Sequence, residues 1–172
     1  MKVGGYVGRV RGRICTMAHV ETSIEVQKTV DQVYAGWIQV ESVPQFMENG
    51  EEVQQLDDKH LEWKAKIAGT QRQWKAEIIE QRPNEVIAWR STTGDRNDGK
   101  VQFVKNNGQT KVTLALDYDP PGGVAGEIGD KLIQAAPGRV ENDLKRFKKF
   151  IEERGTPTGK WSGEVQSGQV KN

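Results

Sequence analysis

The chain has 172 residues, with 25 lysines and arginines against 24 aspartates and glutamates, which gives a formal net charge of +1. This length suits one domain with tails, and so balanced a charge excludes the basic surface that nucleic-acid binding needs. The single cysteine, Cys15, excludes an intramolecular disulfide framework, and two histidines disfavour a zinc site. The sequence lacks the run of about 18 apolar residues that a membrane span needs. We therefore expect a cytoplasmic protein with no cofactor, no metal and no transmembrane segment.

Both ends of the chain differ in composition from the middle. Residues 1–19 contain basic side chains and no acidic ones, and a glycine- and arginine-rich end of this kind rarely orders itself. We expect residues 1–19 to be a flexible extension, in which either Met1 or Met17 is the start of the protein. The polar stretch 156–172 is predicted to be a flexible tail. The domain is therefore predicted to span residues 20–155.

The first elements of this domain follow from short patterns. Apolar and polar residues alternate over 20–27, which predicts a half-buried strand. Thr29 is typical of a helix N-cap, and the apolar residues from Val30 to Trp37 have helical spacing. Pro44 ends this helix, and a short second helical turn follows it. Residues 53–118 then alternate between strand-like runs and turn signals, which predicts a long antiparallel meander.

Turn signals predict how the strands of the meander pair. Asn107-Gly108 is the strongest hairpin signal, and we place further two-residue turns at Gly69-Thr70 and Pro83-Asn84. A loop of odd length near Gly94 keeps the apolar residues of neighbouring strands on one face. The register of the strand at 53–56 stays open. The predicted pairs are Ala65 with Trp74, Trp63 with Ala76, Ile78 with Trp89, Phe103 with Val112, and Val101 with Leu114.

One face of the predicted sheet is apolar and the other is mostly charged, so the apolar face needs a cover. Apolar residues at helical spacing from Ile128 to Ile151 supply it, with a kink or an interruption expected at Pro137-Gly138. The sequence therefore predicts an α+β protein. Its antiparallel sheet curves around a long C-terminal helix, and two short helices follow the first strand.

Six segments carry a resemblance to a known family. They are residues 43–47 (VPQFM), 61–63 (LEW), 74–78 (WKAEI), 88–91 (AWRS), 97–101 (NDGKV) and 116–120 (LDYDP). They resemble the START/polyketide cyclase-dehydrase superfamily, abbreviated SRPBCC, with its helix-grip fold, and in particular its bacterial cyclase/dehydrase branch. The resemblance covers residues 20–153. It implies a cavity between sheet and helix that accepts a lipid, a polyketide, a quinone or a similar hydrophobic molecule.

The inward face of the sheet carries the candidate ligand site. Its three tryptophans have two interpretations, since pockets and cores use the same residue types: they fill the core beneath the helix, or they line a pocket of about 300–1,000 Å³. The hydroxyl of Tyr118 could orient a ligand carbonyl or could reach solvent at the rim. The candidate ligand-binding residues are Trp63, Trp74, Trp89, Ser91, Phe103, Leu116, Tyr118 and Leu132.

Three functions stay open. No catalytic constellation is visible, because Cys15 and His19 precede the domain and His60, next to Asp57 and Asp58, is expected at a solvated hairpin tip. The absence of a His, Asp or Glu on the inward face of the sheet counts against an aromatic polyketide cyclase/dehydratase. A protein-interaction module would need a large exposed apolar patch. We favour binding or transport of a small hydrophobic ligand.

Overall fold

The computed structural model describes most of the chain: residues 2–10, 13–48, 50–67, 69–119, 127–154 and 164–171, with side chains from Ala18 onward except those of residues 67, 127–130, 132 and 133. The elements in these ranges are β1 (Lys2–Val10), β2 (Arg13–Val26), α1 (Val30–Ile38), the 3₁₀ helix η1 (Val40–Gln45), β3 (Gly50–Gln55), β4 (His60–Ile67), β5 (Thr70–Arg82), β6 (Val86–Thr93), β7 (Asn97–Asn106), β8 (Gln109–Tyr118), α2 (Glu127–Glu153), β9 (Glu164–Gln166) and β10 (Gln169–Lys171).

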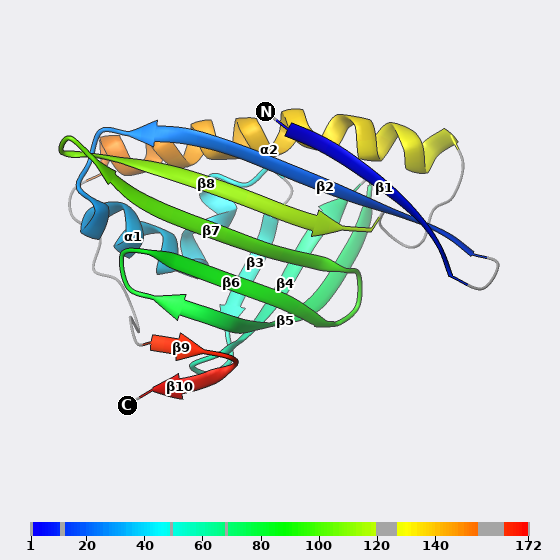
Figure 1. The fold of residues 1–172 in the computed structure, drawn as a ribbon, viewed down its shortest axis with the longest axis horizontal. Helices are drawn as coiled ribbons and strands as arrows, with labels where there is room; N and C mark the ends of the chain where they lie inside the picture. Colours follow the sequence, from blue (N-terminus) through cyan, green and yellow to red (C-terminus); the bar gives the residue numbers. More distant parts are fainter. Residues whose placement is uncertain are drawn as a thin grey trace.

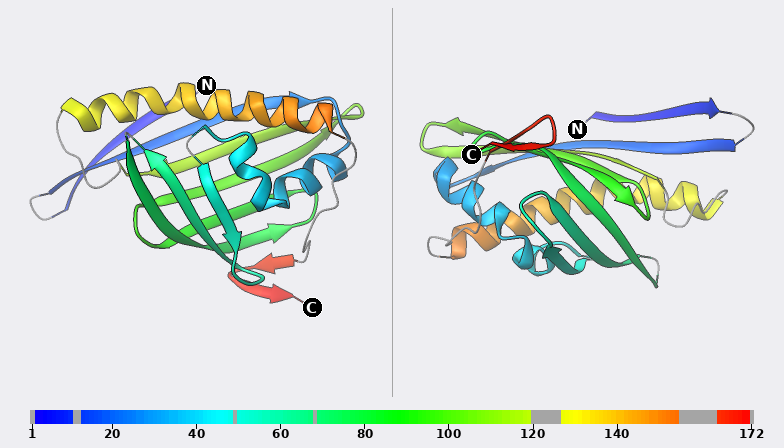
Figure 2. Two further views of the ribbon diagram at one scale, coloured as in Figure 1. Left: turned by 180° about the vertical axis from the view of Figure 1, so that it is seen from behind. Right: turned by 90° about the horizontal axis from the view of Figure 1, so that it is seen from below.

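The strands form one antiparallel sheet that curves around α2. Their order across the sheet is β1-β2-β8-β7-β6-β5-β4-β3, with β9 joined to β5 and β10 joined to β9. α2 lies along one side of the sheet, and α1 and η1 lie beside it on the same side (Figure 1; Figure 2). This α+β arrangement, with two short helices early in the chain and a long helix near its end, confirms the predicted fold class.

The start of the chain differs from the flexible extension expected over 1–19. Residues 13–19 belong to β2, and β1 pairs antiparallel with β2 from Lys2 opposite Glu21 to Val10 opposite Arg13. The physical reason is the edge of the sheet: β2 would otherwise present unpaired backbone groups along this stretch, and β1 supplies their partners. Together β1 and β2 form an arm that projects beyond the neighbouring strands (Figure 1).

The end of the chain also differs from the tail expected over 156–172. β9 and β10 form a hairpin, and Val165 of β9 lies opposite Gln81 of β5 with its side chain 0 % exposed. The Lys59 ammonium donates to the Gly168 carbonyl at 2.7 Å, which ties the turn of the hairpin to the sheet. Burial of one apolar side chain thus gives residues 164–171 a place in the fold that their composition does not indicate.

Two of the three predicted hairpin registers are confirmed. β7 and β8 pair Phe103 with Val112 and Val101 with Leu114 around the Asn107-Gly108 turn. β5 and β6 pair Ile78 with Trp89 as expected. The turn between β5 and β6 has three residues rather than two, and an irregularity between Ile78 and Glu80 absorbs the extra residue.

The β4–β5 hairpin is displaced by two residues from the prediction. Trp63 lies opposite Trp74, where the sequence suggested Ala76, and Ala65 lies opposite Arg72. A shift of two residues keeps every side chain on its expected face. The observed register sets Glu62 opposite Lys75, whereas the predicted one set like charges against each other, and opposite charges across a pair are the more stable choice. β3 pairs with β4 so that Val53 faces Trp63.

α2 covers the apolar face of the sheet. It runs from Glu127 to Glu153 with Pro137 inside it, so the interruption expected there is absent. The described part of its predicted stripe, Val140, Leu144, Phe147 and Ile151, is buried. Phe147 packs against the rings of Trp37 and Phe46 at centroid distances of 4.9 and 5.1 Å. None of the helices in the described ranges is long and apolar enough to cross a membrane.

Candidate functional site

An apolar cavity of about 170 Å³ lies between the sheet and α2. We call it the outer cavity. It is smaller than the sequence suggested, because three indole rings occupy much of the space on the inward face of the sheet. Its lining residues come from β3 to β8, from the turn after η1 and from α2: Met47, Gly50, Trp63, Ala65, Trp74, Trp89, Asn97, Leu114, Leu116, Tyr118, Ala136, Arg139, Val140 and Asp143.

Stacked tryptophans form one wall of the outer cavity. The rings of Trp63 and Trp74 face each other across the β4–β5 pair, with centroids 5.8 Å apart and planes 6° from parallel. Trp89 on β6 packs its ring directly over the backbone of Gly99 on β7, where a Cβ atom would lie 2.2 Å from the ring atom Cζ2. The outer cavity thus presents large, fixed aromatic surfaces, which favour flat apolar molecules.

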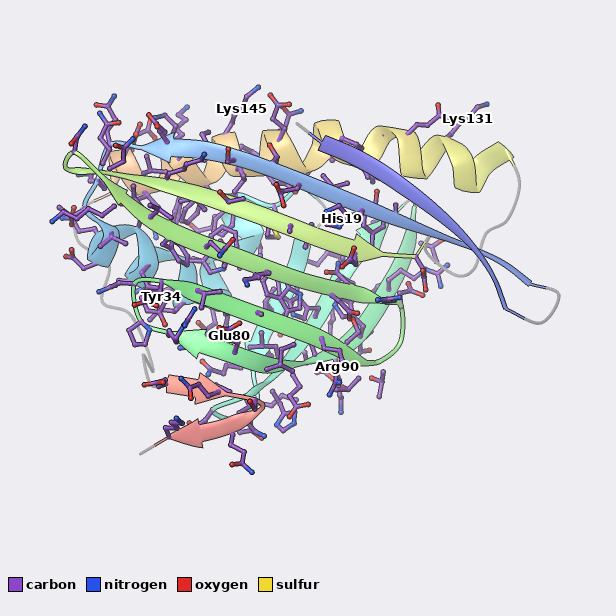
Figure 3. All side chains as sticks on the ribbon, viewed as in Figure 1. His19, Tyr34, Glu80, Arg90, Lys131 and Lys145 are labelled. Carbon is purple, nitrogen blue, oxygen red and sulfur yellow. The ribbon has the colours of Figure 1, made fainter. Side chains whose placement is uncertain are left out.

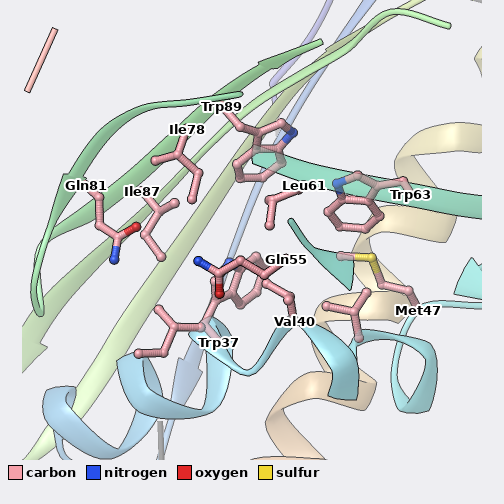
Figure 4. A pocket seen from close by; sticks show the side chains of 12 residues that line it. Trp37, Val40, Met47, Gln55, Leu61, Trp63, Ile78, Gln81, Ile87 and Trp89 are labelled. Atoms are coloured by element: carbon pink, nitrogen blue, oxygen red, sulfur yellow. The ribbon is translucent and has the colours of Figure 1, made fainter. Parts of the chain in front are cut away.

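A second, smaller cavity of about 50 Å³ lies deeper, between α1, η1 and strands β3 to β6 (Figure 4). We call it the inner cavity. It is apolar except for the amides of Gln55 and Gln81. The Gln81 side-chain amide donates to the Tyr34 hydroxyl at 3.0 Å, and burial raises the pKa of Tyr34 to about 12 although this hydrogen bond lowers it. This buried polar pair is therefore satisfied and neutral at ordinary pH.

Three residues that line the outer cavity carry hydrogen-bond donors without partners in the described part of the chain. Trp63 Nε1, Trp74 Nε1 and the Tyr118 hydroxyl are shielded from solvent and have no hydrogen-bond partner among the residues that the structure describes. Burial also raises the pKa of Tyr118, which keeps its hydroxyl protonated. Buried donors without partners are costly, so an acceptor oxygen brought by a ligand would stabilise them.

α2 adds polar groups to the opposite wall. Arg139 and Asp143 lie one helical turn apart and both line the outer cavity. Burial raises the pKa of the Asp143 carboxyl, although it accepts hydrogen bonds from the Glu48 backbone at 3.0 Å and from the Arg146 side chain. Arg146 is held in turn by the Phe46 carbonyl at 2.8 Å. A carboxyl with a raised pKa takes up a proton more readily than an ordinary aspartate does.

Comparison of the sequence with known families assigns the chain to one of them. Residues 26–149 match the family described as polyketide cyclase/dehydrase and lipid transport. The chain belongs to this family. A relative in Streptomyces lincolnensis, described as an uncharacterized 17.2 kDa protein in the melC2-rnhH intergenic region, is 41 % identical over 151 residues, which are 87 % of this chain and 99 % of that protein.

Solved structures of a START superfamily protein and of an aromatase/cyclase share the fold. A START superfamily protein from Mycobacterium smegmatis superposes with a TM-score of 0.66 at 18 % identity, covering 78 % of this chain and 97 % of that one. The Zhui aromatase/cyclase from a Streptomyces species has a TM-score of 0.64 at 21 % identity, covering 80 % and 95 %. At these identities the likeness shows the helix-grip fold alone.

The structure brings five of the eight sequence-predicted residues to the outer cavity: Trp63, Trp74, Trp89, Leu116 and Tyr118. Two others lie elsewhere. The Ser91 hydroxyl accepts the Asn97 backbone N–H at 2.7 Å and so closes the loop between β6 and β7. Phe103 is buried against Tyr34 and Trp37, with ring centroids 5.5 and 6.2 Å apart. The side chain of the eighth, Leu132, lies outside the described residues.

Several lining residues escaped the sequence analysis, among them Met47, Arg139 and Asp143. Met47 lies inside a segment that carries the family resemblance, and its neighbours there gave no reason to point it inward. Arg139 and Asp143 follow the helical spacing of the stripe that contains Val140, which is the signal that could have found them. Being polar, neither was counted in the apolar stripe.

Both histidines lie away from the cavity. His19 is on the outer face of the sheet, where its Nδ1 is 2.7 Å from an Asp117 oxygen (Figure 3). His60 pairs with Asp57 at 2.8 Å at the β3–β4 turn, and both side chains are exposed. Within the described residues, no three His, Cys, Asp or Glu side chains gather as metal ligands.

Proposed function

We propose that the protein binds or carries a small, flat, hydrophobic molecule with ring oxygens in the outer cavity. The observation that carries the proposal is a pair of stacked indole rings in the wall of one apolar cavity, together with three lining residues whose shielded donors have no partner among the described residues. Aromatic walls favour a flat ring system, and the donors favour carbonyl or hydroxyl oxygens on it. Membership of a family of polyketide cyclases, dehydrases and lipid transporters supports a ligand of this chemistry.

The size of the outer cavity limits the ligand. An apolar cavity of about 150 Å³ holds one benzene ring, so about 170 Å³ limits the ligand to one or two six-membered rings. The largest ligand that we expect is therefore a system of two fused six-membered rings. 1,4-Naphthoquinone has this size and two carbonyl oxygens, and we choose it as the probe.

The test is a fluorescence titration with a matched competitor. 1,4-Naphthoquinone should quench the tryptophans saturably at one equivalent, and naphthalene, which lacks the oxygens, should displace it only at about tenfold higher concentration, because one or two hydrogen bonds are lost. Trp74→Phe keeps a ring in the wall and removes one donor, so it should reduce this preference. Quenching that never saturates would overturn the proposal.

A second function, an enzyme of the aromatic cyclase/dehydratase type, is favoured by Asp143. Its carboxyl has a raised pKa and lines the outer cavity, and such a group can take or give a proton next to a bound ketone. α-Tetralone, a bicyclic ketone of fitting size, should then exchange its α-hydrogens in D₂O faster with the wild type than with Asp143→Asn. The variant Asp31→Asn, at an exposed position on α1, is the control. Equal exchange rates for all three proteins would dismiss the enzymatic function.

A protein-interaction module has less support. Among the residues that the structure describes, the exposed large apolar side chains are Leu56 and Val104, at the β3–β4 turn and on β7. Two scattered side chains are normal on a protein surface and do not form a docking patch.

A further inference from the structure

A thin partition separates the two cavities. Met47, Trp63 and Trp89 line both the outer and the inner cavity, so one side of each of these side chains faces each space. We call these three side chains the partition. Beyond it, the inner cavity continues the apolar path away from α2, between residues such as Leu61 and Ile87 (Figure 4).

Two parts of the partition are fixed in place. The Trp63 ring is stacked against Trp74 with nearly parallel planes. The Trp89 ring lies so close to Gly99 that a single added Cβ atom would overlap it. Rotating either ring would break a packed contact over a large surface, and interiors packed this densely resist such movement.

Met47 is the member of the partition that is not an aromatic ring. It follows η1 and is only half-buried, and its backbone N–H is held by the Val43 carbonyl at 2.9 Å. Its side chain points its thioether toward Trp63 (Figure 4). Because the hydrogen bond to Val43 fixes its backbone, a substitution that shortens the Met47 side chain should open the partition while both rings stay in place.

We propose that Met47 determines how long a ligand the protein accepts. This inference rests on the proposed function. With Met47 across the partition, a two-ring ligand fills the outer cavity and no part of it enters the inner one. Without that side chain, the inner cavity of about 50 Å³ receives an alkyl substituent of about three or four carbons. Met47 is thus a specificity-determining residue for ring ligands with and without an alkyl tail.

A series of 2-alkyl-1,4-naphthoquinones with tails of zero to six carbons tests this role. In the wild type, affinity should not rise with tail length. In Met47→Ala, each of the first three or four methylenes should raise affinity about fourfold, as expected for a methylene that leaves water, and the gain should then stop. Met47→Leu has nearly the same volume and should behave as the wild type does.

A second variant distinguishes the effect of opening the partition from the effect of simply enlarging the outer cavity. Leu116→Ala enlarges the far wall of the outer cavity and leaves the partition intact. It should not reproduce the dependence on tail length, and thermal melting of each variant verifies that it is folded. If the unsubstituted quinone binds the wild type but all variants respond alike to tail length, the role of Met47 is wrong and the proposed function stands. If the unsubstituted quinone fails to bind the wild type, the proposed function is wrong, and this inference is overturned with it.

Discussion

At the scale of single residues, the burial of the Tyr34 hydroxyl gives the fold a measurable response to pH. The pKa of Tyr34 is raised to about 12 in the folded protein, against about 10 in an unfolded chain. As pH rises through this interval, the unfolded state loses its proton first. The stabilising effect is therefore fully present below about pH 10 and is lost as pH approaches 12.

Urea unfolding of the wild type between pH 9 and 12 should show this loss as a fall of roughly 2 kcal/mol in the free energy of unfolding. Tyr34→Phe removes the ionisable hydroxyl, so its curve should fall less over the same range. Parallel curves for the two proteins would mean that Tyr34 titrates alike in the folded and unfolded states.

Two glycines should respond to the same substitution in opposite directions. Gly99→Ala places a Cβ atom against the Trp89 ring, so it should lower the free energy of unfolding by about 1–3 kcal/mol. Gly138→Ala meets nothing within 4 Å on α2, and alanine is the better helix former, so it should raise stability by up to about 1 kcal/mol. Chemical denaturation of both variants checks the pair, and a neutral Gly99→Ala would show that the ring is not fixed there.

At the scale of elements, strands and helices could be predicted from the sequence where a local pattern extends over several residues. The Asn107-Gly108 hairpin and the stripe on α2 could be predicted because turn chemistry and helical period each constrain many positions. The β4–β5 register could not be fixed by the apolar pattern, since a shift of two residues preserves every face. Charge pairing of Glu62 with Lys75 separates the two registers, as does the stacking of Trp63 on Trp74.

The β9–β10 hairpin escaped prediction for a different reason. Each strand has three residues, too few for a period to show, and the hairpin forms because Val165 finds a buried site beside Gln81. Val165→Ala should therefore cost about 2 kcal/mol of stability, from lost apolar burial and a small cavity. Val104→Ala, at an exposed position on β7, is the matched control and should be nearly neutral. Equal melting temperatures for the two variants would show that the hairpin is only loosely attached.

At the scale of the whole molecule, the candidate site combines a wall that the sequence could reveal with one that it could not. Trp63, Trp74 and Trp89 could be assigned to the inward face because strand alternation decides it. The opposite wall depends on how α2 and the turn after η1 pack against the sheet, which no local pattern encodes. That is why Met47 emerged only from the structure, whereas the helical spacing of the α2 stripe could have found Asp143.

The central claim is that a ligand occupies the space between the sheet and α2, and calorimetric titration with 1,4-naphthoquinone tests it most directly. Ala136 lines the outer cavity and is buried, whereas its neighbour Ala135 is exposed on the same helix. The wild type and Ala135→Phe should bind one equivalent with a negative heat-capacity change, as burial of apolar surface requires. Ala136→Phe fills the cavity and should remain folded without binding. Equal binding by both variants, or no binding by the wild type, would contradict the account.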